Sequence, residues 1–109
     1  MNKDIKDKIR LLKLVRTRIN NQNEFYICNA TFRLGEEKPE LAKAGGQIRS
    51  YIRTALNADS NINEIHFGGI CTLDNWIGRY RRDYTDGSRA ARLQWIDWMI
   101  NCYEEYYKV

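Results

Sequence analysis

The sequence is poor in the residues that most catalytic and metal sites require. Its 109 residues contain one histidine, His66, and three widely separated cysteines, Cys28, Cys71 and Cys102. A Ser-His-Asp or Cys-His arrangement would have a single candidate base, and no recognisable motif surrounds a nucleophile. The cysteines and the histidine also lack the paired short spacing of zinc ligands. We therefore expect a protein that is not an enzyme and that holds no metal and no cofactor.

Long apolar runs and phosphate-binding loops are absent as well. No stretch approaches the roughly 18 apolar residues of a membrane span, and no apolar run follows the charged N-terminus as in a secretory leader. The pairs Gly45-Gly46 and Gly68-Gly69 lack the spacing and the lysine of a P-loop. An odd number of cysteines without a leader indicates reduced thiols, so we expect a cytoplasmic protein with no membrane association.

The length and the net charge of the chain indicate the number of domains and the class of partner. A chain of 109 residues predicts one domain, spanning residues 1–109. The net charge of +4 and the pI near 9.0 are modestly basic. This balance favours a nucleotide, a nucleic acid or an acidic protein as partner.

The C-terminal stretch is the most strongly patterned part of the chain. After Asp86-Gly87, one row of apolar residues falls at 93, 96, 100, 103 and 107, and a second row falls at 95, 99, 102 and 106. Together the rows cover more than half the circumference of a helix. We therefore expect an all-α fold, a small bundle of four to five helices packed around this apolar C-terminal helix. A helix this apolar is difficult to cover in so short a chain, which favours a homo-oligomer.

Four further helices are predicted before it, and the last of them begins at Thr72 after an irregular segment, residues 57–69. Residues 4–19 carry an amphipathic pattern. Residues 25–34 have the β-branched and aromatic content of a strand, but one helical face holds residues 25, 28 and 32, and Asn23 and Gly35 fit helix caps, so we favour a helix. Pro39 fits the first turn of a third helix, residues 39–56. Within it, Gly45-Gly46 indicates close approach of another helix, or of a ligand.

The span 76–95 is the candidate binding site, because basic and aromatic residues alternate along it. The N-terminal turn of the last helix attracts anions, and two arginines three residues apart bind phosphate oxygens well. Arg92 precedes Ile96 by one turn on the buried stripe, so we expect it to point toward a rim or pocket. The aromatic rings would stack on a base. The predicted ligand-binding residues are Arg89, Arg92, Arg79, Arg82, Tyr80, Tyr84 and Trp76.

Two alternatives remain for these charges. The arginines of the span are equally explained by helix-dipole stabilisation and by pairing with the acids at 83, 86 and 97. The first helix carries most of the positive charge, with Lys6, Arg10 and Lys13 along one face. That face is either solvated or a surface for an acidic partner or for nucleic-acid phosphates.

Three stretches resemble a group of small phage-encoded helical accessory proteins. They are FYICNA (residues 25–30), TLDNWI (72–77) and RAARLQWIDWMI (89–100), and the resemblance covers residues 24–101. It implies a phage protein that counters host immunity in the host cytosol. The leading hypothesis is sequestration of a phosphate-bearing signalling nucleotide without turnover. The alternatives are an inhibitor of a host defence complex or nuclease acting through the basic helix, and a small nucleic-acid-binding protein.

Overall fold

Four α-helices and one short 3-10 helix make up the described part of the chain, which comprises residues 3–57 and 89–107 of this computed structural model. Backbone alone is described for residues 51–57, 91, 95, 98, 102 and 105–107. The elements are α1 (Lys3–Asn20), α2 (Ile27–Glu37), η1 (Pro39–Leu41), α3 (Ala42–Asn57) and α6 (Arg89–Tyr107). These residues contain no strand, so the predicted all-α class is confirmed, and so is the choice of helix for residues 27–34.

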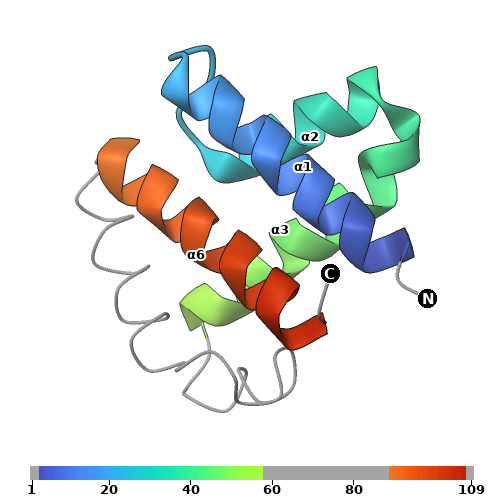
Figure 1. Cartoon of the computed structure of the whole chain (residues 1–109). Helices are drawn as coiled ribbons and strands as arrows, with labels where there is room; N and C mark the ends of the chain where they lie inside the picture. Colours follow the sequence, from blue (N-terminus) through green and yellow to red (C-terminus); the bar gives the residue numbers. More distant parts are fainter. Residues whose placement is uncertain (1–2, 58–88, 108–109) are drawn as a thin grey trace.

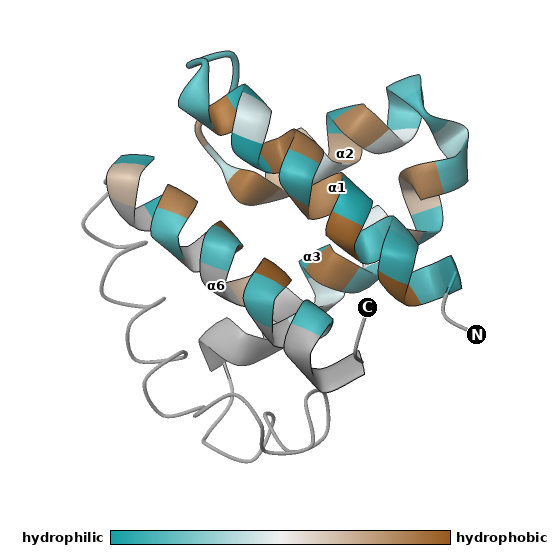
Figure 2. Cartoon of the chain, viewed as in Figure 1, coloured by the Kyte–Doolittle hydropathy of each residue, from teal (hydrophilic) through white to brown (hydrophobic). Residues whose placement is uncertain are grey.

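Helix α1 contacts each of α2, α3 and α6 (Figure 1). Helix α6 runs antiparallel beside α1, whereas α2 and α3 lie behind α1 in this view. The apolar stripe of α1 and the inner faces of the other helices form one core, as the alternating bands of α1 illustrate (Figure 2). The fully buried large side chains of this core are Leu11, Leu12, Ile19, Ile27, Leu34, Leu41, Ile48, Ile96 and Met99.

Helix α1 ends in a Schellman motif. The backbone N–H of Gln22 donates to the carbonyl of Ile19 at 3.1 Å, and that of Asn23 donates to the carbonyl of Arg18 at 3.0 Å. Gln22 has a φ of 66°, the left-handed conformation that this motif requires and that glycine adopts at lower cost. The motif explains how the polar break after residue 19 turns the chain back toward α2.

The ends of α2 differ from those predicted. Tyr26, with extended backbone, is the N-cap in place of Asn23, and its side chain makes no capping hydrogen bond. Gly35 lies inside the helix, which continues until the N–H of Lys38 donates to the carbonyl of Leu34 at 2.8 Å. A Cβ at Gly35 would lie 3.2 Å from the Cα of Ala42. This glycine therefore permits close packing of the following turn and does not terminate the helix.

Gly45 marks a close approach of helices, as predicted. A Cβ there would lie 3.2 Å from the carbonyl oxygen of Thr31 on α2 and 3.6 Å from Cδ2 of Leu11 on α1. At Gly46 the nearest atom is the tip of the Arg49 side chain, 3.8 Å away. Only the first glycine of the pair is therefore required by packing. Pro39 begins a helical turn, as predicted, but this turn is the separate 3-10 helix η1, and α3 itself begins at Ala42.

Several predictions fall outside the described residues. They include the irregular segment 57–69 beyond its first residue and the helix expected from Thr72. In the second apolar row predicted for the C-terminal helix, the side chains of Trp95, Cys102 and Tyr106 are not described either. Within residues 3–57 and 89–107, no helix combines the length and the apolar character that crossing a membrane requires.

Candidate functional site

The N-terminal turn of α6 places Arg92 against two aromatic rings from the start of α2. The side chain of Arg92 is buried, with 3% of the residue exposed. Its Cζ lies 4.1 Å from the ring centroid of Phe25 and 5.3 Å from that of Tyr26. These distances are in the range of cation–π interactions, which strengthen when the cation is removed from water. The prediction that Arg92 turns away from open water is confirmed, whereas the rim or pocket expected beside it stays a prediction.

Arg89, one turn earlier, contacts the same aromatic pair from a more open position. It is half-buried, and its Cζ lies 5.2 Å from the ring centroid of Phe25. The rings of Phe25 and Tyr26 meet edge to face, with centroids 5.0 Å apart and an interplanar angle of 83°. The Tyr26 residue is 46% exposed. Two guanidinium groups and an accessible ring thus meet at one end of the bundle.

The sequence pattern predicts the two arginines of this arrangement, Arg89 and Arg92, but not its aromatic rings. It places the aromatic surface within the span 76–95. The structure assigns Phe25 and Tyr26, whose adjacent rings before a helix start were the available signal. The other predicted ligand-binding residues, Trp76, Arg79, Tyr80, Arg82 and Tyr84, lie outside the described residues.

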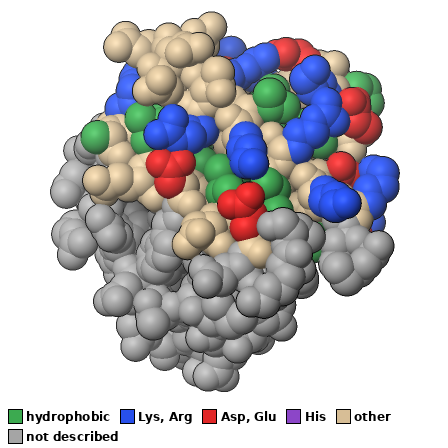
Figure 3. Space-filling model, in the orientation of Figure 1, with side chains coloured by type: hydrophobic (Ala, Val, Ile, Leu, Met, Phe, Trp, Pro, Cys, Tyr) green, Lys and Arg blue, Asp and Glu red, His purple; other side chains and the backbone are tan. Residues whose placement is uncertain are grey.

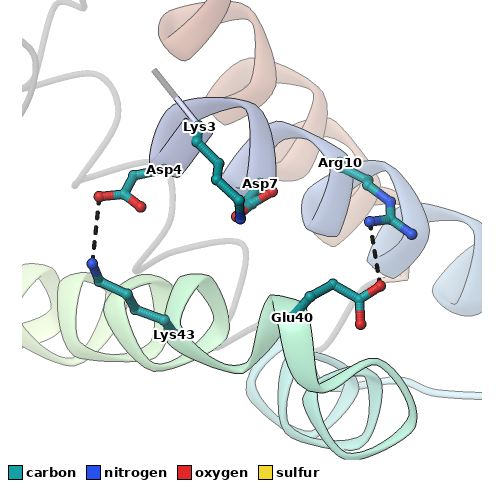
Figure 4. Close-up of polar contacts among 6 residues, drawn as sticks. All are labelled: Lys3, Asp4, Asp7, Arg10, Glu40 and Lys43. Carbon is teal, nitrogen blue, oxygen red and sulfur yellow. Dashed lines mark hydrogen bonds and ion pairs between the residues drawn. The ribbon is translucent and has the colours of Figure 1, made fainter. Parts of the chain in front are cut away.

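The predicted partner surface on α1 is exposed, but two of its three cations are paired. The Nη1 atom of Arg10 lies 3.6 Å from a carboxylate oxygen of Glu40 (Figure 4), and Nζ of Lys13 lies 3.7 Å from one of Glu104. Within the described part of the chain, no ion pair involves the exposed Lys6. The α1 face thus carries less unbalanced charge than its sequence indicates.

Further ion pairs connect α1 to the other helices. Arg16 donates from Nε and Nη2 to the two carboxylate oxygens of Asp97 on α6, at 2.6 and 3.2 Å. Arg18 donates to both carboxylate oxygens of Glu37, and this hydrogen bonding lowers the pKa of Glu37 below its ordinary value. Nζ of Lys43 on α3 approaches Asp4 at 3.5 Å (Figure 4).

Positive and negative side chains consequently alternate over this face of the molecule (Figure 3). Lys3 also donates to Asp7, one turn further along α1, at 2.8 Å. Lys8 is half-buried, and its Nζ lies 5.8 Å from the ring centroid of Tyr103 on α6. Partial burial lowers the pKa of this lysine. These contacts serve the packing of α1 and leave little charge for an anionic partner.

The chemistry that the described residues offer is cationic and aromatic. They contain no group of three or more histidine, cysteine, aspartate or glutamate side chains placed to hold a metal ion. Cys28 is half-buried. The arrangement at the start of α6 suits recognition of an anion joined to a planar group.

Comparison with family models, with curated proteins and with solved structures finds no match to this chain.

Proposed function

We propose that this protein is a non-enzymatic binding protein that captures a phosphate-bearing nucleotide at the N-terminal turn of α6. The observation that supports this proposal is the pair of arginines held against Phe25, with the Tyr26 ring accessible beside them. Phosphate and base are the two parts of a nucleotide, and this corner of the bundle offers one surface for each.

The residues would divide the ligand between them. Arg89 is half-buried, so its guanidinium is the group placed to fork onto phosphate oxygens, together with backbone N–H groups of the first turn of α6. Arg92 is too buried for direct contact in this conformation. Its charge lies behind that of Arg89 and adds to the positive potential. The exposed ring of Tyr26 would stack on the base.

The biological setting follows from the resemblance to phage accessory proteins and is part of the proposal. The protein would sequester a signalling nucleotide of host immunity in the host cytosol, without turning it over. Arg79, Arg82, Tyr80, Tyr84 and Trp76 would complete the site. The apolar α6 would be the helix around which the bundle packs, and its tryptophan side chains would favour a homo-oligomer.

The alternative of a protein inhibitor acting through Lys6, Arg10 and Lys13 has weaker support. Two of these side chains already approach carboxylates of the same chain, at 3.6 and 3.7 Å. An acidic partner would have to compete with these internal pairs. The same competition weakens the proposal that this face binds nucleic-acid phosphates.

The test is thermal unfolding with a panel of mononucleotides and dinucleotides. At about a hundredfold excess over Kd, binding to the folded state should raise Tm by roughly 10 °C or more. Arg89→Gln should remove the shift, whereas Arg33→Gln, the same change at an exposed arginine paired with Glu24 at 3.0 Å, should keep it. The nucleotide should be recovered intact after heat denaturation. A panel that produces no shift contradicts the proposal.

A further inference from the structure

A second arginine lies on an exposed aromatic ring farther along α2. The Cζ of Arg49, on α3, is 5.5 Å from the ring centroid of Phe32, and the Phe32 residue is 54% exposed. Arg49 is held there because its Nη1 donates to Oγ1 of Thr31 at 3.1 Å, and Thr31 in turn donates to the carbonyl of Cys28 at 2.7 Å. The guanidinium is therefore positioned by the fold.

The two exposed rings beside these arginines share one exposed arc: Tyr26 is the N-cap of α2 and Phe32 lies within α2. Tyr26 and Phe32 are the two large apolar side chains that stand exposed in the described part of the chain. At 100° per residue, Asn29 lies between them on the outward arc of α2, and it is exposed. Tyr26, the N-cap of α2, and Phe32 are six residues apart, which corresponds to a rise of about 9 Å along the helix axis between their Cα atoms. The arc thus presents a ring, an amide and a second ring in succession, and by the same spacing it also carries the exposed Arg33, which is paired with Glu24.

The charges on this arc differ from those on α1. Arg49 and Arg89 are half-buried, and within the described residues neither makes an ion pair with a carboxylate. Their contacts there are aromatic rings and, for Arg49, a hydroxyl group. A cation stacked on a ring keeps its full charge and its N–H donors at the guanidinium edge. An anion that lies along the arc finds positive charge at both ends.

We infer that the ligand of this protein carries two bases joined through phosphate, and that it lies along the α2 arc from Tyr26 to Phe32. This inference rests on the proposed function and extends it. Arg89 and Arg49 bind the phosphates, each exposed ring stacks on one base, and the Asn29 amide lies within the span to hydrogen-bond a base edge or the linker. The occupant is a dinucleotide, because two stacking positions are present.

The spacing of the rings also determines the ligand's shape. Bases stacked in a strand are about 3.4 Å apart. This is far less than the axial rise of roughly 9 Å between Tyr26 and Phe32. The two bases must therefore be splayed, each on its own ring, as in proteins that recognise unstacked bases. A ligand with a single base reaches one position only.

The experiment is isothermal titration of the full chain with the linear dinucleotide pApA, with AMP and with an oligo(dT) strand. The pApA should bind about 5- to 150-fold more tightly than AMP, the gain expected from one more stacked base. Phe32→Ala and Arg49→Gln should lower pApA affinity toward that of AMP and leave AMP binding unchanged. Arg33→Gln removes the same charge from an arginine paired with Glu24, so it should leave both affinities unchanged.

The outcomes separate this inference from the function on which it rests. If AMP and pApA bind equally and Phe32→Ala has no effect, the two-base inference is wrong while the nucleotide site stands. If neither binds, both fail. If oligo(dT) binds much more tightly than pApA, or if Arg33→Gln weakens binding as much as Arg49→Gln, the dinucleotide assignment is wrong. Self-association that Phe32→Ala abolishes would assign the arc to a second copy and would also overturn it.

Discussion

The outward faces of α1 and α2 use positive charge in opposite ways. On α1, five of the cations approach carboxylates within the described residues, and four of these carboxylates lie on other elements, in the pairs Arg10–Glu40, Lys13–Glu104, Arg16–Asp97 and Arg18–Glu37. On α2, the arginines that approach from α3 and α6 contact aromatic rings.

This difference shows why the density of charge in a sequence is a poor guide to a binding surface. The most basic helix of the chain is largely neutralised within the fold, since its lysines and arginines connect helices. The helix with little positive charge of its own receives arginines from two distant segments. The proposed binding surface for anions lies where cations meet rings, because a ring positions a guanidinium without neutralising its charge.

The largest effect expected from this comparison concerns Arg92. Arg92→Ala should lower the free energy of unfolding by roughly 2–4 kcal/mol, because it removes a desolvated cation–π contact with Phe25 and leaves a cavity in a buried position. Arg89→Ala, at the half-buried neighbour, should cost less than about 1 kcal/mol. Urea unfolding measures both. An equal loss of unfolding free energy in the two variants would contradict the view that the Arg92 contact is structural and the Arg89 contact is not.

The glycine pair of α3 gives the next largest effect and sharpens the description of the Arg49 position. Gly45→Ala should destabilise by about 1–2 kcal/mol, because its Cβ would lie 3.2 Å from both the Thr31 carbonyl oxygen and Nη1 of Arg49. Gly46→Ala should stabilise by about 0.5–1 kcal/mol, through helix propensity alone. Thermal unfolding of the two variants is a matched comparison, and stabilisation by both would contradict the close approach.

On α1 the expected effects are smaller, because its ion pairs are exposed. Arg16→Gln should cost about 0.2–1 kcal/mol, and the loss should shrink at high salt, since water and ions screen the pair with Asp97. A double-mutant cycle with Asp97→Asn isolates the coupling. Lys6→Gln, at an exposed lysine for which the described residues supply no carboxylate partner, is the control and should leave stability unchanged.

The smallest effect is a change in pH dependence at Glu37. Arg18 lowers the pKa of Glu37 in the folded state, so the stabilisation is present above the ordinary glutamate pKa of about 4.3 and disappears as the pH falls through the folded-state pKa. Glu37→Gln should thus be less stable than the parent at neutral pH and should converge with it in acid. In an Arg18→Gln background, Glu37→Gln should show no such convergence, because the hydrogen bonds that lower the pKa of Glu37 are already removed. Urea midpoints across this pH range provide the measurement.

Local pattern was sufficient to predict that the described segments are helical and that Arg92 turns away from open water. The apolar spacing of residues 4–19 and the position of Arg92 before Ile96 both follow from helical periodicity, and both are confirmed. The helix over 25–34 was predicted against strand propensity, but its ends were not, because packing against Ala42 determines the role of Gly35. The residues that favour helix caps determine the ends of a helix less strongly than such packing contacts do.

The spacing of residues along the sequence did not predict the contacts between distant segments. Phe25 and Arg92 are 67 positions apart in the sequence, and nothing local to either residue indicates the other. The neutralisation of Arg10 and Lys13 likewise depends on Glu40 and Glu104, which only the folded bundle brings near. The sequence therefore indicated which side chains were unusual, and the fold determined which of them meet.

The antiparallel arrangement of α1 and α6 has a practical consequence. Lys8 and Lys13 of α1 lie beside Tyr103 and Glu104, so the first turns of α1 and the last turns of α6 lie at the same side of the bundle (Figure 1). Nineteen helical residues at 1.5 Å each place Arg89 about 28 Å from that side. An immobilisation handle or a dye joined to either terminal helix there would lie far from the proposed nucleotide site at the start of α6, so sensors could be built without obstructing that site.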